Sequence, residues 1–539
     1  MKRLFSVILT AVLIFSLASC SGRGEDKQIF YALSASPSTL DPQYAKESDA
    51  QLIINNTFEG LVRLSADGEV IPGLAETWEI SSDGLQYTFH LKPGTEWYCP
   101  ISLKNEFGEE FYKKFSAETV TSADFVFAMK RAVSPQTGSR YAHVLFPIEN
   151  AYEIYSGALG VDSLGVYAPD ENTLVIKLHE ACPDLLERLT ESVFMPCNEE
   201  FFNAMNGRYG LSNKHILCNG PFYVSSWDSE SSLTIKRNKF YSGSQTVVPS
   251  SVSFSFDSDY DSVAKKIAAG NLSAALLPPD RATPENSVTV KESANSVFGF
   301  FFNCSDKYLK NNNLRLALCS SVNRELFAET DNAKPMSGFI PESCSASGKN
   351  YREAAGSQTP SIEYNTSSAS ALWQQALTEL ETDKITLTVL CPEWLDSAAR
   401  RQLQIWQQTM GIGIAVTVVN KTADEILSAV EAGDYQIALT GVESPYESAV
   451  DFLASFEGGG IFRFPSEEYD MIIGRLLESE GDDELLGGCY TAETYILQQA
   501  VCFPLYSRSS RFVTAEDIEG ITVAGSENTV SFIGAKRFD

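Results

Sequence analysis

The sequence predicts a mixed α/β protein that is built from more than one lobe. The chain has 539 residues, which is well beyond one domain of about 150 residues. Between residues 61 and 97, short strand patterns alternate with turn signals such as Lys92-Pro93-Gly94. Between residues 369 and 440, helix and strand patterns alternate instead, which is typical of an α/β layer.

In the first half, the elements follow from the spacing of apolar residues. Residues 87–91 alternate between apolar and polar side chains with period two, as a half-buried strand does. Thr121 is a good N-cap for a helix over 123–133, where apolar residues recur at helical spacing. The same criteria predict strands at 29–33, 174–178, 233–235 and 252–256, and helices at 49–58, 261–269 and 314–321.

The second half predicts alternating helices and strands. A helix over 398–410 ends at Gly411, a residue type that commonly terminates helices. Further helices are predicted at 369–381, 423–431 and 482–499, and β-branched residues predict strands at 385–390, 414–419 and 435–440. Residues 346–359 form the most polar interior stretch, and we expect a surface loop there.

Composition excludes one class of partner. Asp and Glu total 70 against 41 Lys and Arg, which gives a formal charge of −29. Because phosphate binding needs clustered cations, nucleic acid is not expected as a partner. The 32 Phe, 22 Tyr and 6 Trp are enough to fill several cores or to line a large cavity.

The N-terminus predicts export and a lipid anchor. Two basic residues precede an apolar stretch at 4–17, which is too short to span a membrane and is typical of a secretory signal peptide. Leu17-Ala18-Ser19-Cys20 resembles the lipobox of bacterial lipoproteins, in which the Cys carries the lipid. We therefore expect a signal peptide at 1–19, lipid attachment at Cys20, a polar tether at 20–27 and a location outside the cytoplasm. The alternative is an ordinary signal peptide with a chance Cys.

Nothing in the sequence points to catalysis, a metal ion or another cofactor. GxSxG, HExxH and P-loop motifs are absent. The histidines are scattered over predicted strands and loops without a partnered acid nearby; they are His90, His143, His179 and His215. The ten cysteines after Cys20 form no CxxC motif and no zinc-type cluster. Export permits disulfides, but the spacing leaves their pairing open. We expect a binding protein rather than an enzyme.

Several motifs occur in a fixed order along the chain. They include Ser38-Thr39-Leu40-Asp41-Pro42, Ile71-Pro72-Gly73-Leu74-Ala75-Glu76-Thr77-Trp78-Glu79, Asn219-Gly220-Pro221-Phe222-Tyr223 and Leu314-Arg315-Leu316-Ala317-Leu318. Taken together, from about residue 28 to the C-terminus, the chain resembles the substrate-binding lipoproteins of bacterial ABC importers. The specific family is the oligopeptide/dipeptide/nickel-binding family, also called solute-binding protein family 5. Scarce and unclustered imidazole ligands disfavour the nickel-binding branch.

The resemblance implies a fold. It is an α/β, two-lobed periplasmic-binding-protein-like fold (type II, cluster C) with an extra β-rich domain inserted in the first lobe. Lobes of this kind close over a ligand by hinge motion. The implied boundaries are 25–58, 181–296 and 509–539 for the discontinuous first lobe, 59–180 for the extra domain and 297–508 for the second lobe.

The resemblance also implies a ligand site between the lobes. In the peptide-binding branch, the segment after the Asp-Pro motif pairs with the peptide backbone; here it contains Lys46, Glu47 and Ser48. Its counterpart on the second lobe contains Gly441, Val442, Glu443 and Tyr446. Val442 stands at the family's aromatic position, and Pro445 replaces the acid that binds the peptide's α-amino group. Because a desolvated ammonium needs a charged partner, Glu443 is the candidate substitute; a surface loop acid is the alternative.

Further residues fall near family positions that face the cleft or support its walls. They are Tyr141, Phe300, Asn303, Trp406 and Tyr506. Core packing is the alternative for each aromatic residue, and Tyr506 is the leading candidate because its polar tip suits a wet cleft. Asp124 is predicted to cap or flank a helix, and Arg131 to lie on the solvated outer face of that helix.

By this resemblance, the chain is expected to be the extracytoplasmic receptor of an ABC importer. It would capture peptides between its lobes, as a monomer without a cofactor, and deliver them to a permease and ATPase in the membrane that holds its lipid. Two alternatives remain. One is a non-peptide solute, such as an oligosaccharide, a modified peptide or a chelate; the other is a lipid-anchored sensor or adhesion protein on the same fold.

Overall fold

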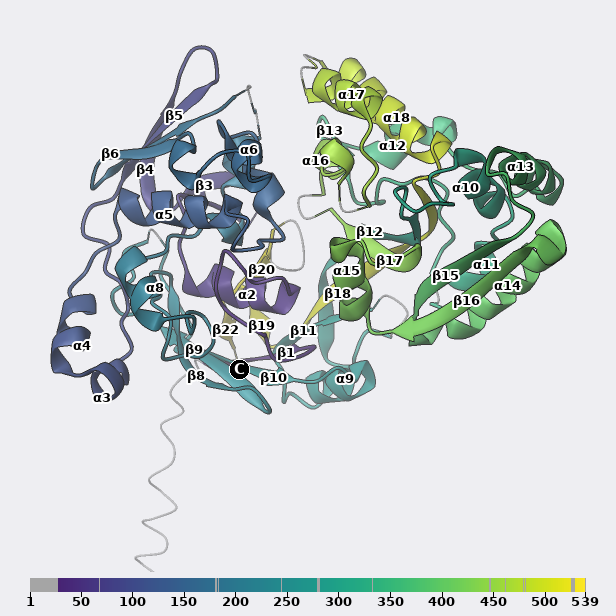
Figure 1. The fold of residues 1–539 in the computed structure, drawn as a ribbon. Coiled ribbons are helices and arrows are strands. Elements are labelled where there is room, and N and C mark those ends of the chain that lie inside the picture. The colour runs from purple at the N-terminus through teal and green to yellow at the C-terminus, as the bar shows by residue number, and fades with distance from the viewer. Residues whose placement is uncertain are drawn as a thin grey trace, which may run out of the picture.

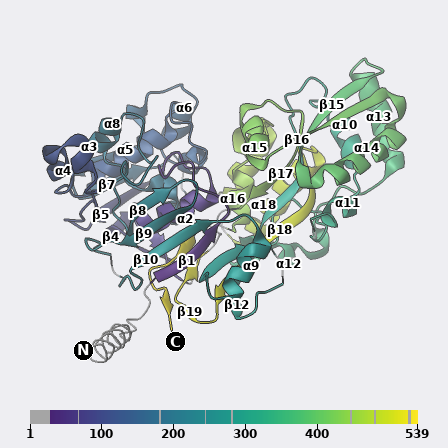
Figure 2. The same cartoon turned by 90° about the horizontal axis from the view of Figure 1, so that it is seen from below.

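The computed structural model describes residues 28–538, except 67, 180, 181, 183, 244, 279–281, 332, 445, 446, 461, 478, 480 and 525–528. The expected signal peptide, Cys20 and the tether lie outside the described residues, as does Tyr446. The rest of the chain forms two lobes that share one sheet (Figures 1 and 2).

The shared sheet has ten strands in the order β16-β15-β17-β12-β18-β11-β1-β10-β9-β8. Its strands are β1 (Gln28–Leu33), β8 (Phe222–Asp228), β9 (Ser232–Arg237), β10 (Ser251–Phe256), β11 (Ala274–Leu277), β12 (Ser287–Phe302), β15 (Ile385–Pro392), β16 (Ile414–Lys421), β17 (Ile437–Glu443) and β18 (Cys502–Ala515). β1 runs parallel to β10 and β11, and β15 runs parallel to β16 and β17. The sequence predicted all of these except β8, β11, β12 and β18.

Two long strands, β12 and β18, connect the lobes (Figure 1). β18 pairs with β11 of the first lobe over residues 511–514, whereas β12 pairs with β17 of the second lobe over 296–302. The two long strands pair with each other in between, and their ladder has three register shifts, one of which separates Ser293 from Ser296. The boundaries expected at 296/297 and 508/509 both fall inside these strands.

A second, four-stranded antiparallel sheet in the order β4-β5-β7-β6 lies in the first half of the chain and packs against helix α5 (Ser122–Val133). Its strands are β4 (Ala75–Ile80), β5 (Gln86–Leu91), β6 (Val166–Asp170) and β7 (Thr173–Lys177). α5 begins at a capping box, in which the Asp124 carboxylate accepts the Thr121 N–H at 2.8 Å. The predicted helix and the capping role of Asp124 are confirmed.

Helices and short strands complete both lobes. The other helices are α2 (Ser48–Thr57), α3 (Leu103–Phe107), α4 (Glu109–Phe115), α6 (Ala151–Tyr155), α7 (Leu185–Arg188), α8 (Glu199–Met205), α9 (Tyr260–Ala268), α10 (Asn312–Cys319), α11 (Glu325–Ala328), α12 (Tyr351–Ala355), α13 (Thr366–Glu379), α14 (Asp396–Met410), α15 (Ala423–Ala432), α16 (Ala449–Ala454), α17 (Glu467–Leu477) and α18 (Asp482–Gln498). The short strands are β2 (Val62–Leu64), β3 (Val70–Pro72), β13 (Ser345–Ala346), β14 (Lys349–Asn350), β19 (Ile518–Glu519), β20 (Thr522–Val523), β21 (Val530–Ser531) and β22 (Lys536–Arg537).

The hydrophobic cores follow the two lobes. The first-lobe core draws its residues from 29–277 and again from 512–535. The second lobe has two cores, one on each face of its part of the sheet, because successive side chains on a strand point to opposite faces. On β12, Phe300 and Phe302 enter one core and Phe301 enters the other.

The expectation of a surface loop at 346–359 is wrong. Part of this stretch forms the hairpin β13–β14 and helix α12, in which Tyr351 is buried. The Tyr351 hydroxyl donates to the Glu493 carboxylate at 3.0 Å, and that carboxylate also accepts the Phe339 N–H at 2.6 Å. A buried acid in the second lobe therefore holds the stretch against α18, which its polar composition did not indicate.

The described residues contain no helix that is long and apolar enough to cross a membrane. The ten cysteines that follow Cys20 are all described, and each is a free thiol in this structure. Nine of them are buried and Cys304 is partly buried, which is the role of small apolar side chains in a core.

Candidate functional site

Two residues that the sequence singled out are in contact, and the charge of a third acts on them from the other lobe. Tyr141 belongs to the first half of the chain, and its hydroxyl donates to the Lys46 carbonyl at 3.4 Å. Burial raises the pKa of Tyr141 to about 12, and the carboxylates of Glu191 and Glu443 also raise it. Glu443 ends β17 in the second lobe, so its charge acts on Tyr141 across the boundary between the lobes.

The segment before α2 contributes a second acid. Glu47 occupies the N-cap position of α2 without a side-chain cap bond. Its Oε2 atom is buried and has no hydrogen-bond partner among the described residues. A buried carboxylate oxygen without a partner is a strong acceptor for a ligand's donor. Ser48 is exposed and is the first residue of α2. Of the three predicted residues, Lys46 and Glu47 therefore lie in the loop before the helix, and Ser48 lies in the helix itself.

Gly441 and two aromatic rings form the adjoining part of the second lobe. Gly441 lies opposite Phe298 in the β17–β12 ladder. A Cβ atom at Gly441 would approach the Phe298 ring to 3.3 Å, which is tighter than ordinary contact. Phe298 in turn stacks on Tyr506, with ring centroids 5.4 Å apart and an interplanar angle of 9°. The glycine therefore makes room for this stacked pair.

The structure places the remaining predicted residues in the cores. Phe300 packs against Trp406, with centroids 5.5 Å apart, and both rings are buried. Asn303 is buried, and its amide is satisfied because it donates to the carbonyls of Gly433 and Tyr435. Val442 and Tyr506 are also buried, at 8% and 0% exposure. These side chains support the wall from behind rather than offering surface to a ligand in this arrangement of the lobes.

A charged contact that the sequence did not indicate spans the lobes. Arg188 ends α7 in the first lobe, and its Nη2 donates to Asp451 Oδ1 of α16 in the second lobe at 2.5 Å. Its Nε donates to Asp184 Oδ2 at 2.8 Å. Asp184 and Arg188 have the i,i+4 spacing that places two side chains on one helical turn. Asp451 lies 263 residues from Arg188, so no local sequence pattern connects it to either residue.

The expectation that Arg131 lies on a solvated outer face is wrong. Its side chain is 10% exposed, and Nη2 lies 2.6 Å from Asp41 Oδ2. The guanidinium also stacks on Phe202, 3.8 Å from the ring centroid. Asp41 belongs to the Asp-Pro motif, so this motif is fixed by a buried ion pair as well as by its proline.

The expectation that no histidine has a partnered acid is also wrong. His215 Nε2 lies 3.1 Å from Glu106 Oε1, and Arg208 shares the same carboxylate at 2.6 Å. The Ser212 hydroxyl lies 3.0 Å from His215 Nδ1, within a turn of the first lobe in which the Lys214 N–H also donates to that hydroxyl. Within the described ranges, no group of three or more His, Cys, Asp or Glu residues is placed to hold a metal ion.

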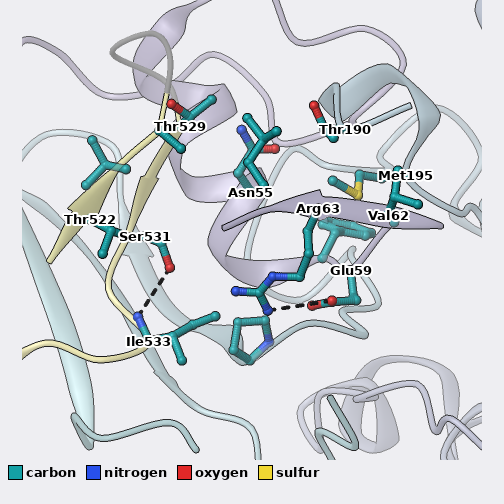
Figure 3. A pocket seen from close by; sticks show the side chains of 16 residues that line it. Asn55, Glu59, Val62, Arg63, Thr190, Met195, Thr522, Thr529, Ser531 and Ile533 are labelled. Carbon is teal, nitrogen blue, oxygen red and sulfur yellow. Dashed lines mark hydrogen bonds and ion pairs between the residues drawn. The ribbon is translucent and has the colours of Figure 1, made fainter. Parts of the chain in front are cut away.

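A cavity of about 80 Å³ lies inside the first lobe, between the end of α2, β2 and the C-terminal strands (Figure 3). Drug-sized ligands occupy pockets of about 300 Å³ or more, so this cavity is too small for a peptide. Its acid, Glu59, lies 3.7 Å from Arg63 and accepts the Tyr241 hydroxyl at 2.9 Å. Glu59, Arg63 and Tyr241 therefore satisfy one another's charges and hydrogen bonds, which indicates a structural role for this cluster.

Two lobes that share a sheet through two long strands, with polar side chains of both lobes facing each other, define a solute-binding protein. The chain belongs to the bacterial extracellular solute-binding proteins of family 5: the profile described as "Bacterial extracellular solute-binding proteins, family 5 Middle" matches residues 69–463, more than half of the chain. It is therefore an extracytoplasmic binding protein of a non-catalytic family. The resemblance and the fold expected from it are confirmed.

Curated relatives match over almost the whole chain. The dipeptide-binding protein DppE of Bacillus subtilis is 24% identical over 100% of this chain and 99% of its own length. A probable deoxycholate-binding periplasmic protein of Escherichia coli, YgiS, is 25% identical over 89% of this chain and 88% of its own. The structure of OppA from Listeria monocytogenes bound to peptide is 22% identical, with a TM-score of 0.78 over 96% of this chain and 100% of that one.

Two structures of the murein tripeptide-binding protein MppA differ in their likeness to this chain. An Escherichia coli structure has a TM-score of 0.75, with 21% identity over 95% of this chain and 98% of that one. The unliganded open form has a TM-score of 0.62, with 22% identity over the same shares.

Proposed function

We propose that this protein captures peptides between its two lobes and delivers them to an ABC importer. What supports the proposal is membership of the family together with the contact between Tyr141 and Lys46, on which the charge of Glu443 acts from the other lobe. Relatives of similar length named for dipeptide and oligopeptide binding support the ligand class. Selectivity arises because a ligand stabilises the closed lobes that contact it on both sides.

The two acids at this place are proposed to bind the peptide's α-amino group. Glu443 is exposed at the end of β17, and Glu47 has a buried oxygen without a partner in the described structure. An ammonium that leaves water needs such charge-assisted bonds. These carboxylates substitute for the family's acid, whose position holds Pro445. Lys46, Ser48, Gly441 and Tyr446 are proposed to complete the site, and Val442 to support its wall from the core.

The proposal extends to the organisation of the chain. The first lobe comprises 25–58, 181–296 and 509–539, the extra domain 59–180, and the second lobe 297–508. The first 19 residues are removed as a signal peptide, and Cys20 carries the lipid. Replacement by Cys20→Ala tests the anchor, because the protein should then move from the membrane fraction to the soluble one.

Thermal unfolding with trialanine tests the ligand class. Selective binding to the folded state must stabilise it, by about 2.7 kcal/mol at a hundredfold excess over Kd. Trialanine should raise Tm, N-acetyltrialanine should raise it less, and Glu443→Gln should remove the difference between them. Glu230→Gln, an exposed acid in the turn after β8, is the control and should leave the difference intact. No shift with either peptide would contradict the proposal.

Deoxycholate is the second ligand in this experiment, because a relative of similar identity is named for it. A rise in Tm with deoxycholate and none with trialanine would establish a non-peptide solute instead. A bile acid lacks an ammonium group, so its effect should not depend on Glu443.

A further inference from the structure

The contact between Arg188 and Asp451 joins two separately anchored parts of the molecule. Arg188 ends α7, whose Leu185 is fully buried in the first-lobe core. Asp451 lies on α16, whose Phe452 and Leu453 are buried in a second-lobe core. Because each side chain is held by its own core, the 2.5 Å bond between them exists only while the lobes are close together.

The contact is shielded from solvent on both sides. The side chain of Arg188 is 10% exposed, that of Asp451 13% and that of Asp184 31%. Surface ion pairs contribute little because water and salt screen them. This contact escapes most of that screening, and hydrogen bonds between charged groups are stronger than those between neutral ones.

The charges of the contact do not balance. One guanidinium faces two carboxylates, so the buried group has an excess negative charge when both acids are ionised. Arg188 lowers the pKa of Asp184 against the opposing effect of burial, whereas burial raises the pKa of Asp451 to about 7. The two carboxyls therefore titrate as a pair, in which Arg188 favours ionisation and burial favours the uptake of one proton.

Among the described residues, the other groups near these acids that can be named carry no positive charge near pH 7. On the first lobe, the Cys182 thiol donates to Asp184 at 3.2 Å, and burial lowers the pKa of His143 to about 4, which keeps it neutral near pH 7. On the second lobe, burial raises the pKa of Cys344 and Cys489 to about 12, so both remain thiols. Ser448, at the N-cap of α16, contributes only a hydroxyl.

We propose that Arg188, by bridging Asp184 and Asp451, is an interlobe latch that favours the closed arrangement, most strongly when one of the two carboxylates carries a proton. The latch belongs to the lobes themselves and acts whichever solute is bound. It requires an acceptor oxygen at position 451 but not a negative charge there. Closure therefore takes up a proton, and a rise in pH favours opening.

Small-angle X-ray scattering of the purified protein without solute tests the latch. Asp451→Ala removes the acceptor and should increase the radius of gyration, whereas Asp451→Asn keeps an acceptor oxygen and should remain compact. Wild type should expand between pH 5 and pH 8, and Asp451→Asn should not. Arg400→Gln removes a cation from an exposed pair within α14 and should change nothing.

Two results would overturn the latch. One is an Asp451→Ala protein with the wild-type Tm and the wild-type radius of gyration. The other is an Asp451→Asn protein whose radius of gyration increases as much as that of Asp451→Ala. If Asp451→Ala does not fold, Arg188→Gln removes the same bond from the first lobe and should give the same expansion. Since no solute is present, these outcomes are independent of whether peptides bind.

Discussion

Arg131 and Asp41 form a bidentate ion pair that fixes the Asp-Pro motif against helix α5. The Nη2 atom of Arg131 lies 2.6 Å from Asp41 Oδ2, and Nη1 lies 3.2 Å from Oδ1. Gln43 accepts a further bond from Nη1 at 2.7 Å. Because the loop after β1 leads into Lys46 and Glu47, this pair positions the first-lobe side of the proposed site.

Loss of this pair should destabilise the protein. Arg131→Ala leaves the buried Asp41 carboxylate without its counterion, which costs about 3–5 kcal/mol. Chemical denaturation measures the loss as a lower midpoint. Arg400→Ala, which removes an exposed pair with Asp396, should cost less than about 0.5 kcal/mol. Equal losses for the two variants would contradict the buried role of Arg131.

A side chain at Gly441 should disturb the stacked rings behind the site. Gly441→Val adds volume next to Phe298, where a Cβ atom alone already reaches 3.3 Å. Overpacking of this kind costs about 1–3 kcal/mol, so thermal unfolding should shift downward. Gly474→Val adds the same side chain in α17, where no atom lies within 4 Å of the Cβ position, and should not lower the unfolding temperature. The substitution at Gly441 should also weaken solute binding, whereas that at Gly474 should not.

Asp124 should make stability depend on pH. Burial raises its pKa to about 7 from an ordinary value near 3.8. An acid whose pKa is raised in the folded state contributes stability below its unfolded pKa, and that contribution is lost as pH rises through 7. Asp124→Asn should thus equal wild type below pH 4 and exceed it above pH 7, by up to about 4 kcal/mol. Urea denaturation from pH 4 to 8 measures this, and parallel profiles would contradict it.

The latch should affect solute affinity. A bond that forms on closure lowers the free energy of the closed complex, so its loss reduces affinity by the same free energy. Asp451→Ala should weaken binding by about tenfold, which corresponds to about 1.4 kcal/mol. Calorimetric titration measures Kd, and Asp184→Asn, which keeps the Arg188–Asp451 bond and removes one of the two negative charges, should not weaken binding.

Helices and strands whose pattern of burial is the same along their whole length were predictable from sequence. β5 alternates between buried and partly buried residues along its whole length, which is why period two predicted it. Helix α5 has one buried face and a capping box, and both signals are local. β12 differs because its first half is mostly exposed and its last six residues are all buried. A strand that passes from one lobe to another has no uniform period.

The candidate site was predictable only where a family motif covers it. The resemblance predicted Lys46 and Glu443 on opposite sides of a cleft and Tyr141 at or behind its wall, whereas Phe300 and Trp406, predicted for the same region, are core residues in the structure. Arg188 and Asp451 meet through the closing of two lobes, a relationship across 263 residues. Such pairs follow from tertiary packing and leave no trace in local spacing.

The ribbon of β12 and β18 also determines which way the lobes can move. Paired strands resist shear within their plane, because sliding would break every bond of the ladder, but they bend and twist readily out of it. The shift between Ser293 and Ser296 interrupts the ladder between the lobes and lowers the bending stiffness there. The ribbon therefore favours relative motion of the lobes by bending and twisting over motion by sliding. A solute that enters between the lobes meets a second lobe whose approach is restricted to those motions.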